Sequence, residues 1–203
     1  ESQKASEVSD GDRPLVLIID VSGSMSGDRI AGAKNTLQQV ISQQPEGSEI
    51  GIWTYPSDGG CSPGEFIVPL QAHASIGELQ GTIAGLTTGG STPTGEALQA
   101  AAYQMIGEGR TGGSLLLVSD GESNCSVDPC DTVADIREQG FELAVNTVGF
   151  DISEEGMKQL QCIADATDSK AYEVENPDDL MPLIEDLTQN AITEDIIAPE
   201  VVA

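Results

Sequence analysis

The sequence predicts an α/β fold, with a mostly parallel sheet, helices on both faces and one antiparallel edge strand. Segments with strand patterns alternate along the chain with helical segments of about 10 to 15 residues, as in doubly wound sheets. Residues 15–19 and 115–118 are apolar at every position. Strands that are buried on both faces have this pattern, so these two are expected at the centre of the sheet.

The first quarter of the chain supplies a central strand, a helix and the edge of the sheet. A strand is predicted at 14–21, and the run SGSMSG ends it. Residues 28–43 carry apolar side chains at a helical period, which predicts an amphipathic helix. Strands are predicted at 49–55 and 65–70. The loop between them is rich in Gly and Pro, which is typical of an antiparallel hairpin with a long connection.

The middle of the chain alternates between helices and strands. A short helix is predicted at 75–86, and the loop TTGGSTPT leads into a second helix at 95–106. A strand at 114–119 is apolar at nearly every position and is followed by Ser-Asp-Gly-Glu. A helix at 130–139 and a strand at 141–148 follow it.

The last quarter completes the alternating pattern. A helix is predicted at 153–166, with Ser153 as its N-cap because two Glu residues follow it directly. A short strand at 171–174 and a helix at 176–190 come next. We therefore expect one domain at 14–192, an N-terminal tail at 1–13, and a C-terminal tail or linker at 193–203.

The charge of the chain excludes several classes of partner. The formal net charge is −26, from 34 acidic and 8 basic residues. Nucleic acid and anionic membrane surfaces would be repelled by this charge. No apolar run approaches the roughly 18 residues of a membrane-spanning helix. We therefore expect neither nucleic-acid binding nor membrane insertion.

Four cysteines and a single histidine, His73, favour disulfides over a zinc site with four Cys ligands. Three pairings are possible. We favour Cys61 with Cys125 and Cys130 with Cys162, because the loop that holds Cys125 is central enough to reach both partners. Disulfides imply an oxidising compartment, either the periplasm, the cell surface or the extracellular space.

Polar oxygens follow both central strands. Asp20, Ser22 and Ser24 form a D-x-S-x-S pattern after the first strand, and Asp120 follows the strand at 114–119. Thr92 adds a hydroxyl from the loop TTGGSTPT. Carboxylate and hydroxyl oxygens are hard ligands of the kind that Mg²⁺, Ca²⁺ or Mn²⁺ takes. The D-x-S-x-S pattern alone is equally typical of an ordinary turn or helix cap.

The motifs DVSGSM, TPTGEAL and LLLVSDGE, in this order and on these elements, resemble the metal-ion-dependent adhesion site of von Willebrand factor A domains. The resemblance extends from residue 14 to about residue 187. It implies that Ser22, Ser24 and Thr92 supply hydroxyl ligands, while Asp20 and Asp120 act mostly through metal-bound water. Thr94 is the alternative to Thr92, since both precede the helix.

This resemblance implies an adhesion module that holds one divalent cation, with Mg²⁺ preferred. An acidic group of a protein or glycan ligand would complete the metal shell. The module is expected to be monomeric and part of a larger extracellular, surface or periplasmic protein. The resemblance also implies two states, in which either Asp120 or Thr92 binds the metal directly and the last helix changes position.

Two alternatives stay open. One is a regulatory or assembly subunit of an ATPase or chelatase complex, which would work in the cytoplasm with reduced cysteines. The other is a vestigial site that is kept only for packing.

No enzymatic function is predicted. A haloacid dehalogenase-like phosphatase needs a second Asp where Ser22 stands, and a P-loop is absent. A serine nucleophile needs a nearby His, whereas His73 is predicted beyond the edge hairpin.

Tyr55 ends the second strand, where it can face the rim of the site.

Overall fold

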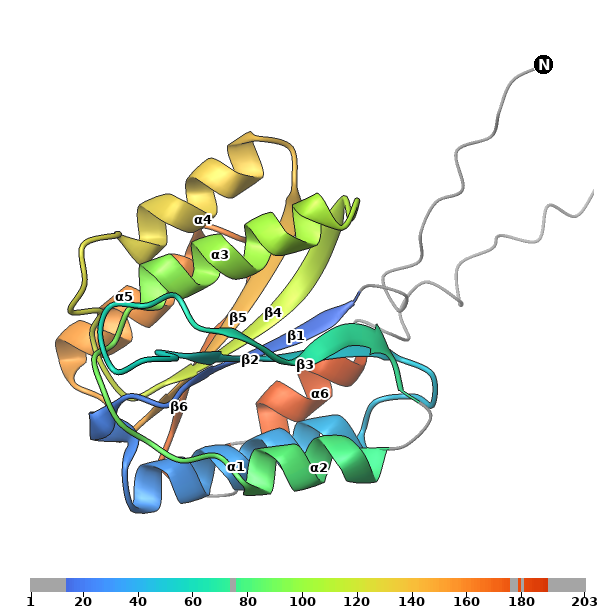
Figure 1. The fold of residues 1–203 in the computed structure, drawn as a ribbon, viewed down its shortest axis with the longest axis horizontal. Coiled ribbons are helices and arrows are strands. Elements are labelled where there is room, and N and C mark those ends of the chain that lie inside the picture. Colours follow the sequence, from blue (N-terminus) through green and yellow to red (C-terminus); the bar gives the residue numbers. More distant parts are fainter. Residues whose placement is uncertain (1–13, 74–75, 176–178, 180, 190–203) are drawn as a thin grey trace, which may run out of the picture.

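The computed structural model describes residues 14–73, 76–175, 179 and 181–189, and it confirms the predicted fold class (Figure 1). Six strands form one sheet in the order β3-β2-β1-β4-β5-β6. Only the β2–β3 pair is antiparallel, and the other four pairs are parallel. The strands are β1 (Leu15–Asp20), β2 (Glu49–Tyr55), β3 (Glu65–Ala72), β4 (Gly112–Ser119), β5 (Glu142–Phe150) and β6 (Ala171–Val174).

Helices cover both faces of the sheet. The helices are α1 (Asp28–Ser42), α2 (Ile76–Ala84), α3 (Thr94–Gly107), α4 (Pro129–Glu138), α5 (Glu154–Asp165) and α6 (Met181–Gln189), with a short 3₁₀ turn at Gly23–Met25. One core layer packs α1, α2 and α6 against the sheet, and the second packs α3, α4 and α5 against its opposite face (Figure 1). All six residues of β1 are buried, as the apolar pattern predicts.

Strand β5 is longer than the sequence pattern predicts. The predicted strand ends at residue 148, before a glycine, whereas β5 continues to Phe150. Gly149 pairs with Ser119 of β4 and with Glu173 of β6. Backbone pairing on both sides holds the glycine in the strand despite its weak intrinsic preference.

The last helix lies within its predicted range. It is expected at 176–190, and α6 spans Met181–Gln189. Residues 176–178, 180 and 190 lie outside the described residues. The predicted tails at 1–13 and 193–203 also lie outside them, so those two assignments stay predictions.

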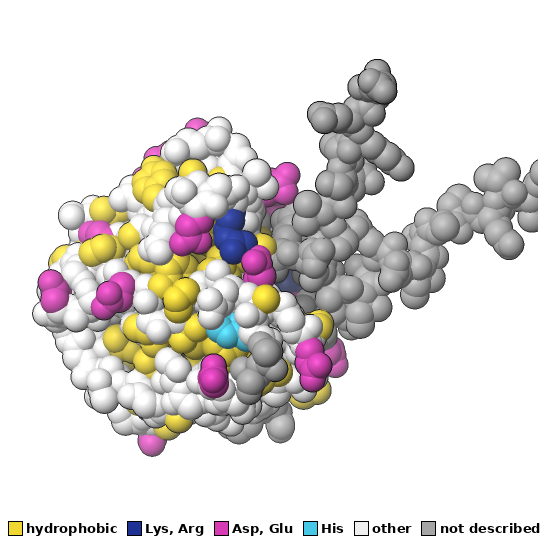
Figure 2. Space-filling view, turned by 45° about the vertical axis from the view of Figure 1, so that its right-hand side comes forward, with side chains coloured by type: hydrophobic (Ala, Val, Ile, Leu, Met, Phe, Trp, Pro, Cys, Tyr) yellow, Lys and Arg dark blue, Asp and Glu magenta, His cyan; other side chains and the backbone are white. Residues whose placement is uncertain are grey.

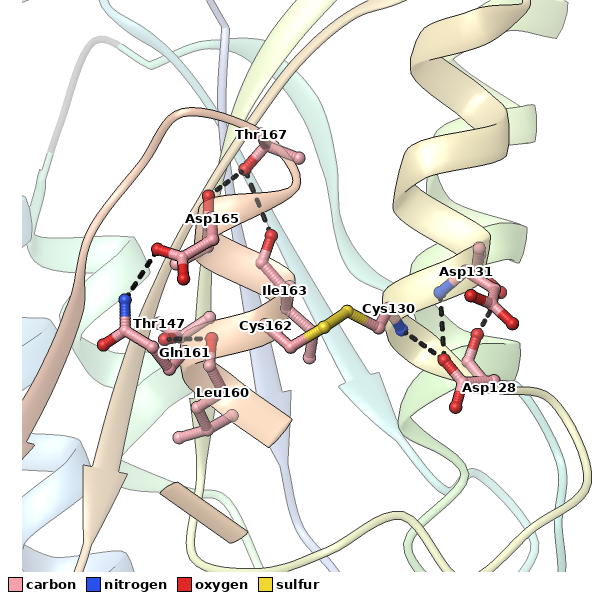
Figure 3. The surroundings of a disulfide bond; sticks show 12 residues. Asp128, Cys130, Asp131, Thr147, Leu160, Gln161, Cys162, Ile163, Asp165 and Thr167 are labelled. Carbon is pink, nitrogen blue, oxygen red and sulfur yellow. Dashed lines mark hydrogen bonds between the residues drawn. A yellow bond between two sulfur atoms is a disulfide. The ribbon is translucent and has the colours of Figure 1, made fainter. Parts of the chain in front are cut away.

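Two disulfides join the elements around one end of the sheet, in the two pairs that the sequence analysis favoured. Cys61, in the β2–β3 loop, is bonded to Cys125, in the β4–α4 loop. Cys130 is bonded to Cys162, which links α4 to α5 (Figure 3). Both cysteine pairs have Cα atoms 5.8 Å apart. One disulfide therefore ties the β2–β3 loop to the β4–α4 loop, and the other ties α4 to α5.

The predicted N-cap of α5 forms, and the structure shows a further N-cap on α4. Ser153 caps α5 by accepting a hydrogen bond from the backbone N–H of Gly156. Asp128 caps α4 by accepting from the backbone N–H groups of Cys130 and Asp131 (Figure 3). Each cap satisfies N–H groups that the helix itself leaves without a partner.

The register of the central strands defines where polar side chains meet. Ile19 of β1 pairs with Val118 of β4, so the next residues along both strands, Asp20 and Ser119, reach the same edge of the sheet. Ligand sites in open α/β sheets lie beyond the carboxyl ends of the strands. A ligand site is therefore expected at this edge, between β1 and β4.

Acidic side chains are spread over the surface shown in Figure 2 rather than gathered in one patch. Hydrophobic side chains are also exposed on this face. No helix among the described residues is long and apolar enough to cross a membrane.

Candidate metal centre

Asp20 is the buried anchor of the candidate site. Its Oδ1 accepts a hydrogen bond of 2.8 Å from the backbone N–H of Ser22, and its Oδ2 accepts one of 2.6 Å from the hydroxyl of Ser119. Burial raises the pKa of Asp20 to about 6, although the hydrogen bonds from Ser119 and Ser22 act in the opposite direction. A carboxylate in this position gains from any nearby cation, because a positive charge offsets the cost of its burial.

Ser22 and Ser24 join Asp20 to Asp120. The hydroxyl of Ser22 lies 3.2 Å from the hydroxyl of Ser24, and Ser24 donates a hydrogen bond of 2.9 Å to Oδ1 of Asp120. The 3₁₀ turn after β1 brings the two serines to the same side. Four of the five predicted site residues therefore form one connected group between β1 and β4.

The loop that carries Thr92 is bonded to this group through the backbone. Gly23 donates to the carbonyl of Gly90 at 3.0 Å, and Gly89 donates to the carbonyl of Val21 at 2.7 Å. Gly90 has a φ of +92°, and a Cβ there would lie 2.5 Å from the Cα of Gly59. Only glycine allows the loop that carries Thr92 to approach the β2–β3 loop, which holds Gly59, this closely.

Thr92 is fixed by Asn124 from the β4–α4 loop. The backbone N–H of Thr92 donates to Oδ1 of Asn124 at 2.8 Å, and the N–H of Asn124 donates to the carbonyl of Thr92 at 3.2 Å. The hydroxyl of Thr92 makes no hydrogen bond within the described part of the chain, although the residue is buried. It is not in hydrogen-bond contact with the four other predicted ligands.

Thr94 has a different environment from Thr92. Its hydroxyl lies 3.2 Å from the hydroxyl of Tyr55, and both residues are buried. Tyr55, which was expected to be able to face the rim, lies beneath the site instead. Its ring is fully buried, and its hydroxyl interacts with Ser119, the residue that holds Asp20. The Thr94 hydroxyl is thus engaged beneath the site, which favours Thr92 over Thr94 as the ligand.

Sequence reasoning missed three residues of this centre. Ser119 holds Asp20, as described above. Arg29, at the start of α1, forms an ion pair of 2.9 Å with Asp120 and one of 2.8 Å with Asp151, which follows β5. Ser119 stands beside Asp120 in the S-D-G-E run, which was a usable signal. Arg29 and Asp151 are 122 positions apart, and no local pattern indicates their contact.

The residues present fit a hard divalent cation better than a softer one. The described part of the chain has no group of three or more His, Cys, Asp or Glu side chains that could hold a metal. A cation at this edge therefore has to use hydroxyl oxygens beside the two aspartates. Hydroxyls, carboxylates and water are the ligands of Mg²⁺, Ca²⁺ and Mn²⁺.

Comparison with known proteins places the chain among similar folds. The model of the von Willebrand factor type A domain matches residues 15–190. No curated protein sequence is similar enough to count as a match.

Solved structures with the same fold include the vWF domain of the type V pili tip protein Mfa5 from Porphyromonas gingivalis. It has a TM-score of 0.70 and 13% identity, over 92% of this chain and 99% of that one. Proximal thread matrix protein 1 of the mussel byssus, with a zinc-occupied MIDAS motif, has a TM-score of 0.67 and 19% identity, over 91% of this chain and 47% of that one.

The pilus adhesin SpaC from Lactobacillus rhamnosus GG, in an open conformation, has a TM-score of 0.64 and 14% identity. The match covers 88% of this chain but only 30% of SpaC. The chain thus spans less than half of the SpaC and byssus chains and nearly all of the Mfa5 domain.

Proposed function

Because the chain belongs to the von Willebrand factor type A family, we propose that it is an adhesion module that binds its ligand through one divalent cation. The cation would be held by Asp20, Ser22, Ser24, Thr92 and Asp120. The observation that carries this proposal is the hydrogen-bonded chain from Asp20 through Ser22 and Ser24 to Asp120 at the carboxyl ends of β1 and β4. The pilus proteins with the same fold support an adhesive role.

The donor set suggests how ligand binding would work. Hydroxyl groups are neutral, so a divalent cation held mainly by them keeps much of its charge. When bound, such an ion supplies a Lewis-acid site that attracts a carboxylate from a protein or glycan ligand. Ser22 and Ser24 would orient their oxygens toward the ion, while Ser119 keeps the Asp20 carboxylate in place.

A binding role needs no catalytic group, and we propose that the domain is not an enzyme. The ring of His73 hydrogen-bonds at 2.7 Å to the carbonyl of Ile50, near the start of β2. The candidate site lies beyond the opposite end of that strand. Within the described residues, neither serine of the site therefore has an imidazole base to activate it.

The disulfides support a proposal for the compartment. Two disulfides are stable in oxidising surroundings, which supports a location at the cell surface, outside the cell or in the periplasm. The same bonds count against a cytoplasmic subunit of an ATPase or chelatase complex. The domain would act as a monomeric module of a larger protein, with Mg²⁺ as the preferred ion.

Calorimetric titration of the metal-stripped protein with Mg²⁺, Ca²⁺, Mn²⁺ and Zn²⁺ tests the proposal. We expect one site per chain in the wild-type protein and none in Asp20→Ala. Asp135→Ala is the matched control, since it removes an exposed aspartate on α4 away from the site. Binding that Asp20→Ala retains would assign the ion to the general negative surface and overturn the proposal.

A further inference from the structure

The guanidinium of Arg29 has a partner for each of its five N–H groups. Nε and Nη2 donate to Oδ2 of Asp151 at 3.2 and 2.8 Å, and Nη2 also donates to the Asp151 carbonyl at 3.3 Å. Nη1 donates to Oδ2 of Asp120 at 2.9 Å and to the carbonyl of Ser24 at 3.1 Å. Since an arginine has five donors, none is left for an external ligand.

Arg29 and Ser24 divide the carboxylate of Asp120 between them. Ser24 donates to Oδ1, whereas Arg29 donates to Oδ2. The side chain of Asp120 is 1% exposed, so this contact is shielded from water. The Asp151 side chain is 83% exposed, so its ion pair adds little energy, but it fixes the plane of the guanidinium.

We propose that Arg29, oriented by Asp151, is a positioning residue that keeps one oxygen of Asp120 away from the cation and thereby makes the site prefer Mg²⁺ over Ca²⁺. This inference rests on the proposed function of the site. It concerns how the chain selects an ion, which the family membership does not specify.

The preference follows from how the two ions use carboxylates. Ca²⁺ takes six to eight oxygens in flexible geometry and often binds both oxygens of one carboxylate. Mg²⁺ requires near-ideal octahedral geometry and keeps several waters, so one carboxylate oxygen is sufficient. With Oδ2 held by Arg29 and Oδ1 accepting from Ser24, Asp120 cannot give both of its oxygens to one cation. The contact between Arg29 and Asp120 therefore weakens the binding of Ca²⁺ more than the binding of Mg²⁺.

Two other roles for Arg29 make different predictions. A contact with an acidic ligand would need a free N–H group, and all five are engaged. If Arg29 were only a structural link between α1 and the end of β5, its removal would lower the stability of the fold and would weaken the binding of both ions to the same extent. The ratio of the two affinities therefore separates ion selection from a structural role.

The test is calorimetric titration of the metal-stripped full chain with Mg²⁺ and with Ca²⁺ at equal ionic strength. In Arg29→Gln we expect the ratio of the Ca²⁺ to the Mg²⁺ dissociation constant to fall by about tenfold, because Oδ2 of Asp120 is released. Arg29→Lys keeps the charge but not the planar fork, so its ratio should also fall. Asp151→Asn should give an intermediate value with Arg29 still present.

The matched control is Arg137→Gln, which breaks an arginine–aspartate pair of 3.0 Å with Asp168, at the opposite end of the sheet. Its ratio should equal that of the wild-type protein. An unchanged ratio in both Arg29→Gln and Asp151→Asn, with the wild-type protein binding Mg²⁺, would overturn the inference alone. Absence of binding to the wild-type protein would overturn the proposed function, and the inference with it.

Discussion

The hydroxyl of Thr94 lies 3.2 Å from the buried hydroxyl of Tyr55, whereas the hydroxyl of Thr92, two residues earlier, makes no hydrogen bond within the described residues. The two threonines are indistinguishable in sequence. Their surroundings separate a residue that is available to a cation from one that holds α3 to β2.

Thr92→Ala should therefore weaken metal binding, whereas Thr94→Ala should lower the stability of the fold. Thr92→Ala removes an oxygen from the candidate site, so we expect at least about tenfold weaker Mg²⁺ binding with little loss of stability. Thr94→Ala removes one of the two hydroxyl partners of the buried Tyr55 hydroxyl, the other being Ser119, and should cost about 1 kcal/mol of unfolding free energy. Titration and chemical denaturation of both variants check this. Equal loss of Mg²⁺ binding in both would contradict the assignment.

Asp20 should make the metal-stripped fold less stable as the pH rises. Burial raises its pKa from 3.8 to about 6, so the folded state binds this proton more tightly than the unfolded state does. Its contribution to stability is complete below about pH 4 and is lost as the pH rises through about 6. The loss amounts to about 3 kcal/mol at pH 7, since one pKa unit corresponds to about 1.4 kcal/mol.

Asp20→Asn cannot ionise, and its amide can still pair with Ser119. At pH 7 and without metal, we expect it to unfold with a free energy up to about 3 kcal/mol above that of the wild-type protein. At pH 4 the two should be alike. Denaturant unfolding in a chelator at both pH values measures the difference. Equal stability at pH 7 would show that the buried carboxylate carries no such cost.

The same carboxylate predicts a pH-dependent affinity for the cation. A divalent ion favours the ionised form of Asp20, so binding must displace the proton wherever the pH is below the pKa of about 6. Mg²⁺ binding should therefore be about tenfold weaker at pH 5 than at pH 7. Proton release, measured by titration at pH 5 in two buffers of different ionisation enthalpy, provides the check. An affinity that is constant from pH 5 to pH 7 would exclude Asp20 from the site.

The strands could be predicted from local signals, and so could the three segments that carry the site, DVSGSM, TPTGEAL and LLLVSDGE. Unbroken apolar runs define β1 and β4, and polar residues directly after them define the edge where Asp20 and Asp120 meet. The limits of β5 could not be predicted, because pairing on both sides keeps Gly149 in the sheet. The link from Arg29 to Asp151 joins residues 122 positions apart, and only the folded sheet brings them together.

The two disulfides should differ in their effect on the metal site, although they stabilise the fold to a similar extent. Each closes a long loop, 64 residues for Cys61–Cys125 and 32 for Cys130–Cys162, so removing either should cost roughly 2 to 4 kcal/mol. Cys125 directly follows Asn124, whose side chain holds the backbone of Thr92. Freeing Cys125 therefore loosens the loop that positions a candidate ligand.

The variant with Cys61→Ser and Cys125→Ser should bind Mg²⁺ more weakly, by about three- to tenfold, since one ligand becomes less ordered. The variant with Cys130→Ser and Cys162→Ser is its matched control. It frees α4 from α5, but leaves the contact between Asn124 and Thr92 in place, so its affinity for Mg²⁺ should match that of the wild-type protein. Titration at a temperature where both variants are folded compares them directly. Equal weakening in both would mean that the first disulfide acts through overall stability and does not position Thr92.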